Sequence, residues 1–206
     1  MRPSTKISLI RHGEVHNPDG IFYGHMPRFR LSDRGVDQAR QAARLLSGKA
    51  LAAVISSPLL RARQTAREIV SLQDGVPYGI SRLITEVKCP YEGWPGAKVD
   101  AMNGDVYSGS GPEFEQPADL VHRMRRFIRR IQTHYPGRHV AAVSHGDPII
   151  FTILWALNQA LTPAWKGRLD AFGFADGYPA LASVTTLTFR TDAEGERPGI
   201  EYVKPY

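Results

Sequence analysis

Short apolar runs alternate with longer amphipathic segments along most of this chain. The runs with the length and composition of buried strands are 6–10, 51–57, 139–144 and 183–189. Between the first two runs, apolar residues recur at helical spacing up to Leu46, and Ser32 or Asp33 can cap this helix. Strands that alternate with helices are typical of βαβ units. We therefore expect an α/β fold, a three-layer sandwich in which helices flank a mostly parallel central sheet.

Two elements are predicted after the second of these runs and well before the third. Ser57 is the expected N-cap of a second helix and Pro58 its first residue, which places Arg61 in the opening turns. Residues 78–87 are less regular, and we interpret them as a short third strand that ends at Glu86.

The second half of the chain predicts two more helices and one irregular segment. One helix is expected over about 118–135, and another begins at Pro148. Gly and Pro are frequent from 88 to 117, which predicts a loop-rich excursion that caps a substrate site. The chain after Arg190 is polar, and we expect it to be loosely packed.

Composition favours one ordinary globular domain. The chain has 206 residues, 42% hydrophobic and 22% charged, so we expect a single domain over 1–206. Cys89 is the only cysteine, so no intrachain disulfide is possible and we expect a reducing, cytoplasmic setting. The N-terminal stretch lacks the apolar core of a secretory signal. The apolar segment 148–157 is shorter than the roughly 20 residues that span a bilayer, so no membrane contact is expected.

The formal net charge of +6 is compatible with nucleic acid, an anionic membrane surface or a small anionic substrate. Many of the arginines fall in two predicted helices, one of them over 121–130. We interpret that basic stretch as the solvated face of an amphipathic helix and expect no nucleic-acid partner.

Candidate chemistry gathers at the predicted strand ends. The residues that follow strands are Arg11, His12, Gly13, Arg61, Glu86, His145 and Gly146. In an open α/β sheet, ligands bind beyond the carboxyl ends of the strands. We therefore expect two histidines, two arginines and a carboxylate to converge on one rim.

This set of side chains can cleave a phosphate ester. Two arginines offer forked donors to phosphate oxygens. A neutral imidazole at His12 can attack phosphorus, and neighbouring cations favour the neutral form. Glu86 can protonate the leaving group and then activate water, and a protonated His145 would stabilise the equatorial oxygens. Gly13, Gly146 and the N-terminus of the helix near Pro148 would add backbone donors.

Several motifs together resemble the histidine phosphatase superfamily, the phosphoglycerate mutase-like proteins. They are "LIRHGEVHN" (9–17), "LSDRGVDQA" (31–39), "SSPLLRARQTA" (56–66), Glu86, "VSHG" (143–146) and "ASVTTLTF" (182–189). The resemblance covers about 7–189. It implies a phosphorylated nucleophile at His12, with Arg11, Arg61 and His145 completing the phosphate pocket. It also implies Asn17 as a residue that holds the phosphoryl group, Glu86 as the acid, and no metal or cofactor.

Other residues are candidates for the organic part of a small phosphorylated substrate. Tyr23 and Trp94 lie in predicted rim loops and could flank it. Gly24 is a further expected substrate-binding residue, as is Gly146 through its backbone amide. Tyr23 and Trp94 are equally compatible with a role in packing the core.

The chain departs from the family pattern after the candidate acid. The stretch "EVKCPYEGW" (86–94) is one residue shorter up to Glu92 than the usual phosphatase element, which leaves Glu92 as a rival acid. Glu115 remains in register with Arg123. Residues 87–90 replace the Arg-His-Tyr-Gly of the mutase branch, so we expect a phosphomonoesterase. The alternatives are a phosphoglycerate mutase-type phosphotransferase and a non-catalytic phospholigand-binding protein.

One pair of histidines has the spacing of a possible metal site. His12 and His16 have the i,i+4 spacing that can bind zinc on a helix. Arg11 would repel a dication there, and no cysteine is nearby. We expect no metal and no cofactor, and the sequence carries no signal for an oligomeric state.

Overall fold

The computed structural model describes residues 4–191, 193 and 195–206. Within these residues, six strands form one mixed sheet in the order β3-β2-β4-β1-β5-β6. The strands are β1 (Thr5–Arg11), β2 (Leu51–Ser56), β3 (Tyr78–Ile80), β4 (His139–Ser144), β5 (Val184–Phe189) and β6 (Gly199–Val203). The first four are parallel to one another. Strand β5 pairs antiparallel with β1, and β6 pairs antiparallel with β5.

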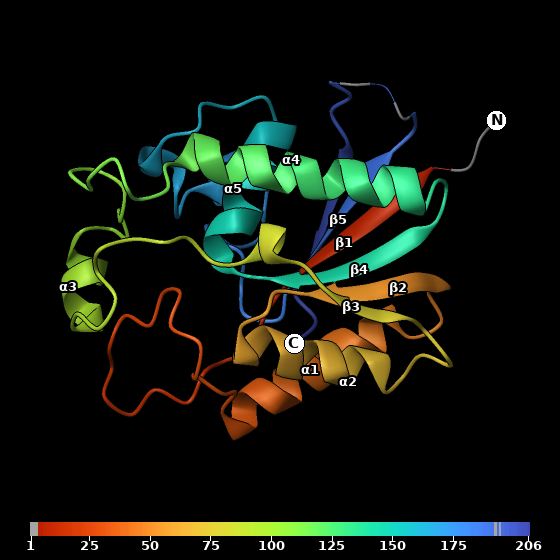
Figure 1. The fold of residues 1–206 in the computed structure, drawn as a ribbon, viewed down its shortest axis with the longest axis horizontal. Helices are drawn as coiled ribbons and strands as arrows, with labels where there is room; N and C mark the ends of the chain where they lie inside the picture. The colour runs from red at the N-terminus through yellow and green to blue at the C-terminus, as the bar shows by residue number, and fades with distance from the viewer. Residues whose placement is uncertain (1–3, 192, 194) are drawn as a thin grey trace.

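Helices cover both faces of the sheet, as Figure 1 shows. They are α1 (Asp33–Leu46), α2 (Leu60–Val70), α3 (Gly96–Ala101), α4 (Pro117–His134) and α5 (Gly146–Ala156). The pair α1 and α2 lies on one face, and α4 and α5 lie on the other. The expected three-layer α/β sandwich is therefore confirmed.

Each face of the sheet has its own apolar core. The core on the side of α4 and α5 is the larger, and the other core packs α1 and α2 against the sheet. All residues of α5 are buried, because α4 covers the side of α5 that would otherwise face solvent. This position explains the continuous apolar run from Pro148 to Leu157, since a helix buried on all sides needs no polar face. None of the described helices is long and apolar enough to cross a membrane.

The prediction of a strand over 78–87 was largely wrong. Strand β3 ends at Ile80, and the Ser81 Oγ accepts a hydrogen bond from the Leu83 N–H to begin a 3-10 helix over Arg82–Ile84. Glu86 therefore follows a 3-10 turn and an irregular residue. A serine that bonds its own backbone two residues on competes with strand pairing.

The predicted start of α2 also needs correction. The helix begins at Leu60 with Leu59 as its N-cap, three residues after Ser57. The Ser57 Oγ accepts from the Leu59 N–H at 3.3 Å and lies 2.7 Å from His145 Nε2. Ser57 thus stabilises the turn before the helix. Arg61 is still in the first helical turn, as expected.

The C-terminal tail is more ordered than expected. Strand β6 pairs with β5 along its whole length, from Gly199 opposite Thr188 to Val203 opposite Val184. The excursion over 88–117 contains the short helix α3 and turns, and it extends away from the sheet.

Two glycines set how closely the end of β1 approaches α1. A Cβ at Gly13 would clash with the backbone carbonyl of Gly35, and a Cβ at Gly35 would clash with the backbone carbonyl of Glu14. The glycine in the first turn of α1 is therefore needed for backbone packing rather than for its backbone conformation.

We expect Gly35→Ala to destabilise the protein, although alanine favours a helix by about 1 kcal/mol. Relieving a clash with a main-chain carbonyl should cost about 1–3 kcal/mol, as overpacking does. Urea unfolding measures the difference. The control is Gly79→Ala, where an added Cβ meets no atom within 4 Å and the free energy of unfolding should not fall. Equal stability of the two variants would contradict the packing role.

Candidate active site

His12 lies directly after β1, and its side chain is buried. Its Nδ1 is 2.8 Å from the Gly13 carbonyl oxygen, and its Nε2 accepts a hydrogen bond from Arg61 Nε at 3.2 Å. Because the carbonyl only accepts and the guanidinium only donates, Nδ1 carries the proton and Nε2 has the lone pair. Burial, followed by the charges of Arg61 and Arg11, lowers the pKa of His12 well below its ordinary value. The ring is therefore neutral and has a nucleophilic nitrogen.

Arg61 is fully buried and connects α2 to the loop that follows His12. Besides His12, it donates from Nη1 to the Met26 carbonyl oxygen at 3.1 Å and from Nη2 to that of Gly24. The Tyr23 ring lies 4.8 Å from its guanidinium carbon. Three of its five N–H groups thus bond the chain itself, which leaves two for a ligand.

Arg11 is the last residue of β1 and faces the same space. Its Nη1 donates to the Pro179 carbonyl oxygen at 2.7 Å, and its guanidinium lies 5.0 Å from the centre of the Tyr178 ring. Within the described part of the chain, Arg11 Nε is buried without a hydrogen-bond partner. A buried donor left unpaired is costly, which indicates that this site is built to receive an acceptor.

His145 is the N-cap of α5, and its ring centre is 5.2 Å from that of His12. Its Nε2 pairs with the Ser57 hydroxyl, whereas Nδ1 is buried with no partner among the described residues. Burial, then the charge of Arg61, lowers the pKa of His145 well below its ordinary value. His145 is therefore neutral before an anion binds, unlike the protonated form considered from the sequence.

Glu86 lies on the wall of a cavity of about 400 Å³, together with Arg11 and His12. One carboxylate oxygen accepts from the Val87 N–H at 2.9 Å. Burial and then the nearby Asp147 carboxylate raise the pKa of Glu86 to about 7, against the opposing charges of Arg61 and Lys166. Such a carboxyl can hold a proton near neutral pH and release it.

Glu92, the rival acid, does not line this cavity. Its Oε1 accepts from the His25 N–H at 2.7 Å, and its side chain packs against Gly24. The structure therefore brings Glu86 toward His12 and uses Glu92 to hold the loop at Gly24.

The remaining sequence candidates have different positions. Asn17, Tyr23 and Gly24 line the cavity. The Asn17 side chain closes on Ile21, donating to its carbonyl at 2.8 Å and accepting from its N–H at 3.3 Å. Arg61, His145 and Gly146 are not among the residues that line this cavity, although Arg61 bonds His12 and the His145 ring packs against that of His12. Trp94 is exposed and stacks edge-on with Tyr91, so it does not line the site.

Both candidate glycines owe their identity to close packing. The Gly13 N–H donates to the Thr65 hydroxyl at 3.1 Å, so it is already bonded within the chain. At Gly146, a Cβ would clash with the ring and hydroxyl of Tyr178. The Gly13 N–H is therefore not free for a phosphate oxygen, whereas the expected backbone contact at Gly146 stays a prediction beside its packing role.

Sequence reasoning missed a second polar cluster beside Glu86. Asp147, in the first turn of α5, accepts from the hydroxyls of Tyr107 and Tyr178 and from the Lys166 ammonium group. Asp147, Lys166 and Tyr178 also line the cavity. The position of Asp147 directly after His145-Gly146 was the available signal, whereas Lys166 and Tyr178 lie between elements and have no periodic pattern.

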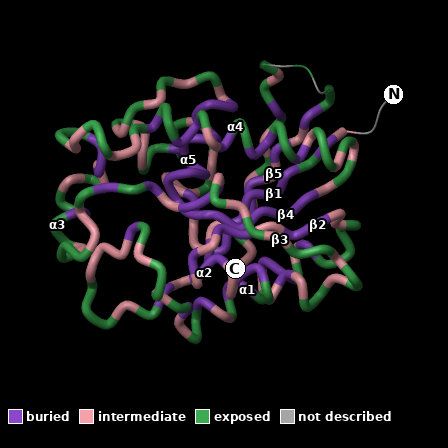
Figure 2. The backbone as a smooth tube through the Cα atoms, viewed as in Figure 1, coloured by how far each residue is buried: buried purple, intermediate pink, exposed green. Residues whose placement is uncertain are grey.

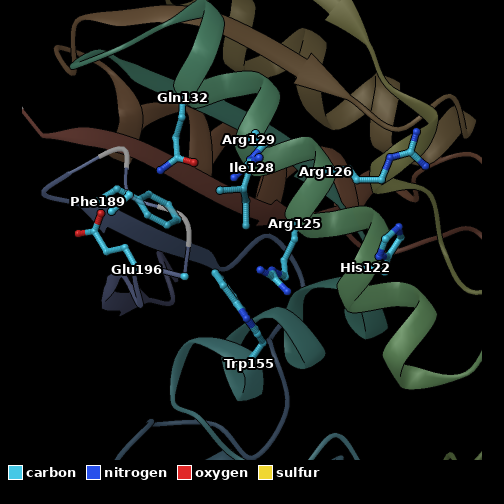
Figure 3. Close-up of a pocket in the computed structure, with 11 residues that line it drawn as sticks. His122, Arg125, Arg126, Ile128, Arg129, Gln132, Trp155, Phe189 and Glu196 are labelled. Carbon is cyan, nitrogen blue, oxygen red and sulfur yellow. The ribbon is translucent and has the colours of Figure 1, made fainter.

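The basic helix has a hollow of its own, away from the strand ends. Arg125 and Arg126 line a pocket of about 240 Å³ between α4 and the segment after β5, and Arg125 lies over the Trp155 ring (Figure 3). Arg123, on the same helix, turns inward and pairs with Glu115. The sequence prediction of a solvated basic face thus describes Arg125 and Arg126 but not Arg123.

Metal ligation has little support in the arrangement of the described side chains. No group of three or more His, Cys, Asp or Glu residues among them could hold a metal ion. His12, whose spacing from His16 suggested zinc, directs its two nitrogens to Gly13 and Arg61 instead.

Known proteins resemble this chain in sequence and in fold. The chain is 33% identical over 206 residues to an uncharacterized protein of Mycobacterium tuberculosis, covering 93% of this chain and 94% of that protein. It is 28% identical over 180 residues to the adenosylcobalamin/alpha-ribazole phosphatase of Escherichia coli, covering 80% and 85%. The fold superposes on mycobacterial glucosyl-3-phosphoglycerate phosphatase with a TM-score of 0.74 at 21% identity, covering 97% of each chain.

A family model extends this agreement to most of the sequence. The model of the histidine phosphatase superfamily, branch 1, matches residues 7–184. This match spans the chain from β1 to the start of β5, including the carboxyl ends of β1, β2, β3 and β4. The protein belongs to the histidine phosphatase superfamily.

Proposed function

We propose that the protein is a phosphomonoesterase that hydrolyses a small phosphate ester through a phosphohistidine at His12. The observation that carries the proposal is the buried, neutral His12, whose Nε2 accepts a hydrogen bond from Arg61 and whose pKa is lowered by burial and then by the charges of Arg61 and Arg11. Phosphatase activity in a relative from Escherichia coli supports the same reaction class. The cavity of about 400 Å³ suits a small-molecule ester.

The first step would transfer the phosphoryl group to the enzyme. Arg61 Nε would move its hydrogen bond from His12 Nε2 to a phosphate oxygen, Nε2 attacks phosphorus, and the bond from phosphorus to the ester oxygen breaks. Glu86 gives its proton to the departing oxygen, so the product leaves as an alcohol. Nδ1 keeps its proton, and the Gly13 carbonyl stabilises the positive charge on the phosphorylated ring.

The second step would return the enzyme to its starting state. The Glu86 carboxylate takes a proton from water as the oxygen attacks phosphorus. The phosphorus–Nε2 bond breaks, and inorganic phosphate forms together with neutral His12 and protonated Glu86. Proton and charge are thus balanced over the cycle.

The phosphate pocket would use donors that have no hydrogen-bond partner among the described residues. Arg11 Nε and the remaining N–H groups of Arg61 would bind phosphate oxygens. A dianion next to His145 would raise its pKa and favour a proton on the unpaired Nδ1. These guanidinium charges supply the positive field, so the proposed reaction needs no metal ion.

We expect His12→Ala to abolish phosphate release from p-nitrophenyl phosphate in the presence of a chelator, because the nucleophile is lost. The matched control is His16→Ala, an exposed histidine that should retain activity within about threefold. Chelator-resistant release in His12→Ala would overturn the proposal. Interconversion of phosphoglycerates without release would indicate a mutase, and phospholigand binding by a wild type inactive on a broad ester panel would indicate a binding protein.

Glu86→Gln should slow esters with poor leaving groups by about 10²–10⁴-fold, the usual contribution of a general acid. It should slow p-nitrophenyl phosphate far less, because that leaving group departs almost without a proton. Values of kcat/KM for an alkyl phosphate and p-nitrophenyl phosphate give the comparison. Glu92→Gln is the control, and a larger selective loss in this variant would make Glu92 the acid instead.

For an alkyl phosphate, kcat/KM should fall as the pH rises through about 7, where Glu86 loses its proton. Protonation of His12 should not limit the rate near pH 6, because its pKa is lowered well below 6.5. A pH profile from 5 to 9 tests this. In Glu86→Gln the fall should disappear, whereas effects of substrate ionisation should remain. A fall that persists in Glu86→Gln contradicts the assignment.

A further inference from the structure

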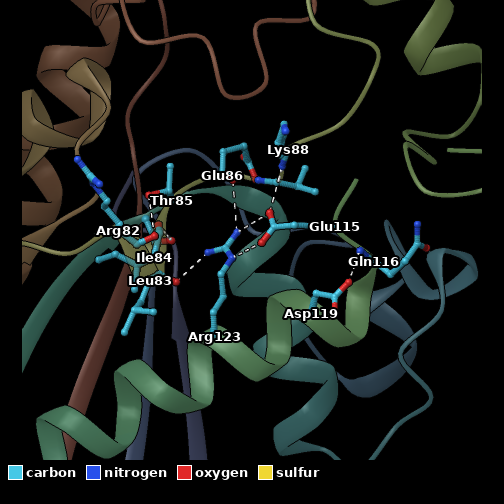
Figure 4. A network of polar contacts seen from close by, with 12 residues as sticks. Arg82, Leu83, Ile84, Thr85, Glu86, Lys88, Glu115, Gln116, Asp119 and Arg123 are labelled. Carbon is cyan, nitrogen blue, oxygen red and sulfur yellow. Dashed lines mark hydrogen bonds and ion pairs between the residues drawn. The ribbon is translucent and has the colours of Figure 1, made fainter. Parts of the chain in front are cut away.

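Arg123 differs from its neighbours on the basic helix by pointing into the protein. Its side chain is 13% exposed and pairs with Glu115, which is 27% exposed. Arg125 and Arg126 on the same helix face solvent. Figure 4 shows the guanidinium of Arg123 beneath the segment that carries Glu86.

The guanidinium bonds two backbone carbonyls around Glu86. Arg123 Nη1 donates to the Leu83 carbonyl oxygen at 2.7 Å, and Nη2 donates to that of Glu86 at 3.3 Å. Nε donates to Glu115 Oε1 at 2.7 Å, which fixes the plane of the fork. One planar group therefore spans the turn that leads to the candidate acid.

Glu115 holds the chain on the other side of Glu86. Its Oε2 accepts from the Lys88 N–H at 3.1 Å while also accepting from Arg123 Nη2 at 3.3 Å. The backbone is thus bonded at residues 83, 86 and 88. From 86 to 89 the chain belongs to no helix or strand that would fix its path.

We propose that Arg123 and Glu115 are positioning residues that hold the backbone at Glu86, so that its carboxyl group reaches the leaving-group side of the cavity. This inference rests on the proposed function, in which Glu86 is the general acid. Neither residue lines the cavity, so they would act only through Glu86. A misplacement of about 1 Å can cost a catalytic group about 10²-fold, which is enough to make such an anchor matter.

The pair does not have to be a major source of stability to have this role. A partly buried ion pair contributes little net free energy, because desolvation offsets the attraction. Its geometry is nevertheless specific, since lysine keeps the charge but lacks the planar fork that reaches two carbonyls and a carboxylate together. Arg123→Lys therefore separates a role of charge from a role of geometry.

The test compares Arg123→Lys and Glu115→Gln with Arg126→Lys, the same chemical change at an exposed position of the helix. For Arg123→Lys, kcat/KM of an alkyl phosphate should fall about 10–100-fold, whereas that of p-nitrophenyl phosphate should change less than about threefold. Glu115→Gln should show the same selectivity with a smaller loss of kcat/KM. Arg126→Lys should match the wild type. Adding Arg123→Lys to Glu86→Gln should cause no further selective loss, because the acid is already absent.

Other outcomes overturn the inference. Equal loss on both esters would mean a general structural role, and a selective loss that persists in the Glu86→Gln background would mean that Arg123 acts elsewhere. Wild-type activity in Arg123→Lys would contradict a role for the planar fork of Arg123.

Hydrogen exchange separates failure of the anchor from failure of the proposed function. The Lys88 amide should exchange faster in Arg123→Lys than in Arg126→Lys, and unchanged exchange overturns the anchor whatever the activity. If the wild type releases no phosphate, or Glu86→Gln shows no leaving-group selectivity, the proposed function fails and the catalytic role of the pair fails with it.

Discussion

The geometry of the site depends on the hydrogen bond from Arg61 Nε to His12 Nε2. It ties the first turn of α2 to the end of β1, and it sets which imidazole nitrogen carries the proton. The same guanidinium holds the loop at Gly24 and Met26. A fully buried cation is costly unless it is well bonded, so this arrangement fixes the loop, the helix start and the imidazole together. The neutral form of His12, the proposed nucleophile, follows from that burial.

The topology of the sheet places this contact at the carboxyl ends of the parallel strands. Strands β1, β2 and β4 are adjacent and parallel, so Arg11, the turn before α2 and His145 meet where their carboxyl ends coincide. Glu86 comes from the irregular chain after β3, which has no ladder to set its path. The proposed acid is therefore the member of the set that most needs support from outside the sheet.

Sequence reasoning found the framework and most of the candidate site for physical reasons. Buried strands are continuous apolar runs, so 139–144 was predicted with its observed bounds. Residues after those runs were placed correctly, because sheet topology determines where they meet. Strand β6 was missed, because it has only five residues, follows a polar stretch, and owes its order to pairing with β5. The partners of Asp147 and the inward turn of Arg123 were invisible, since both depend on which faces pack together.

The contact between Gly146 and Tyr178 has a consequence for how this chain can change. A side chain at position 146 requires the tyrosine to move, and without that tyrosine Asp147 loses one of its hydroxyl donors while Arg11 loses the ring beneath it. Replacing either residue alone therefore gives a less stable protein. Positions 146 and 178 can change only together.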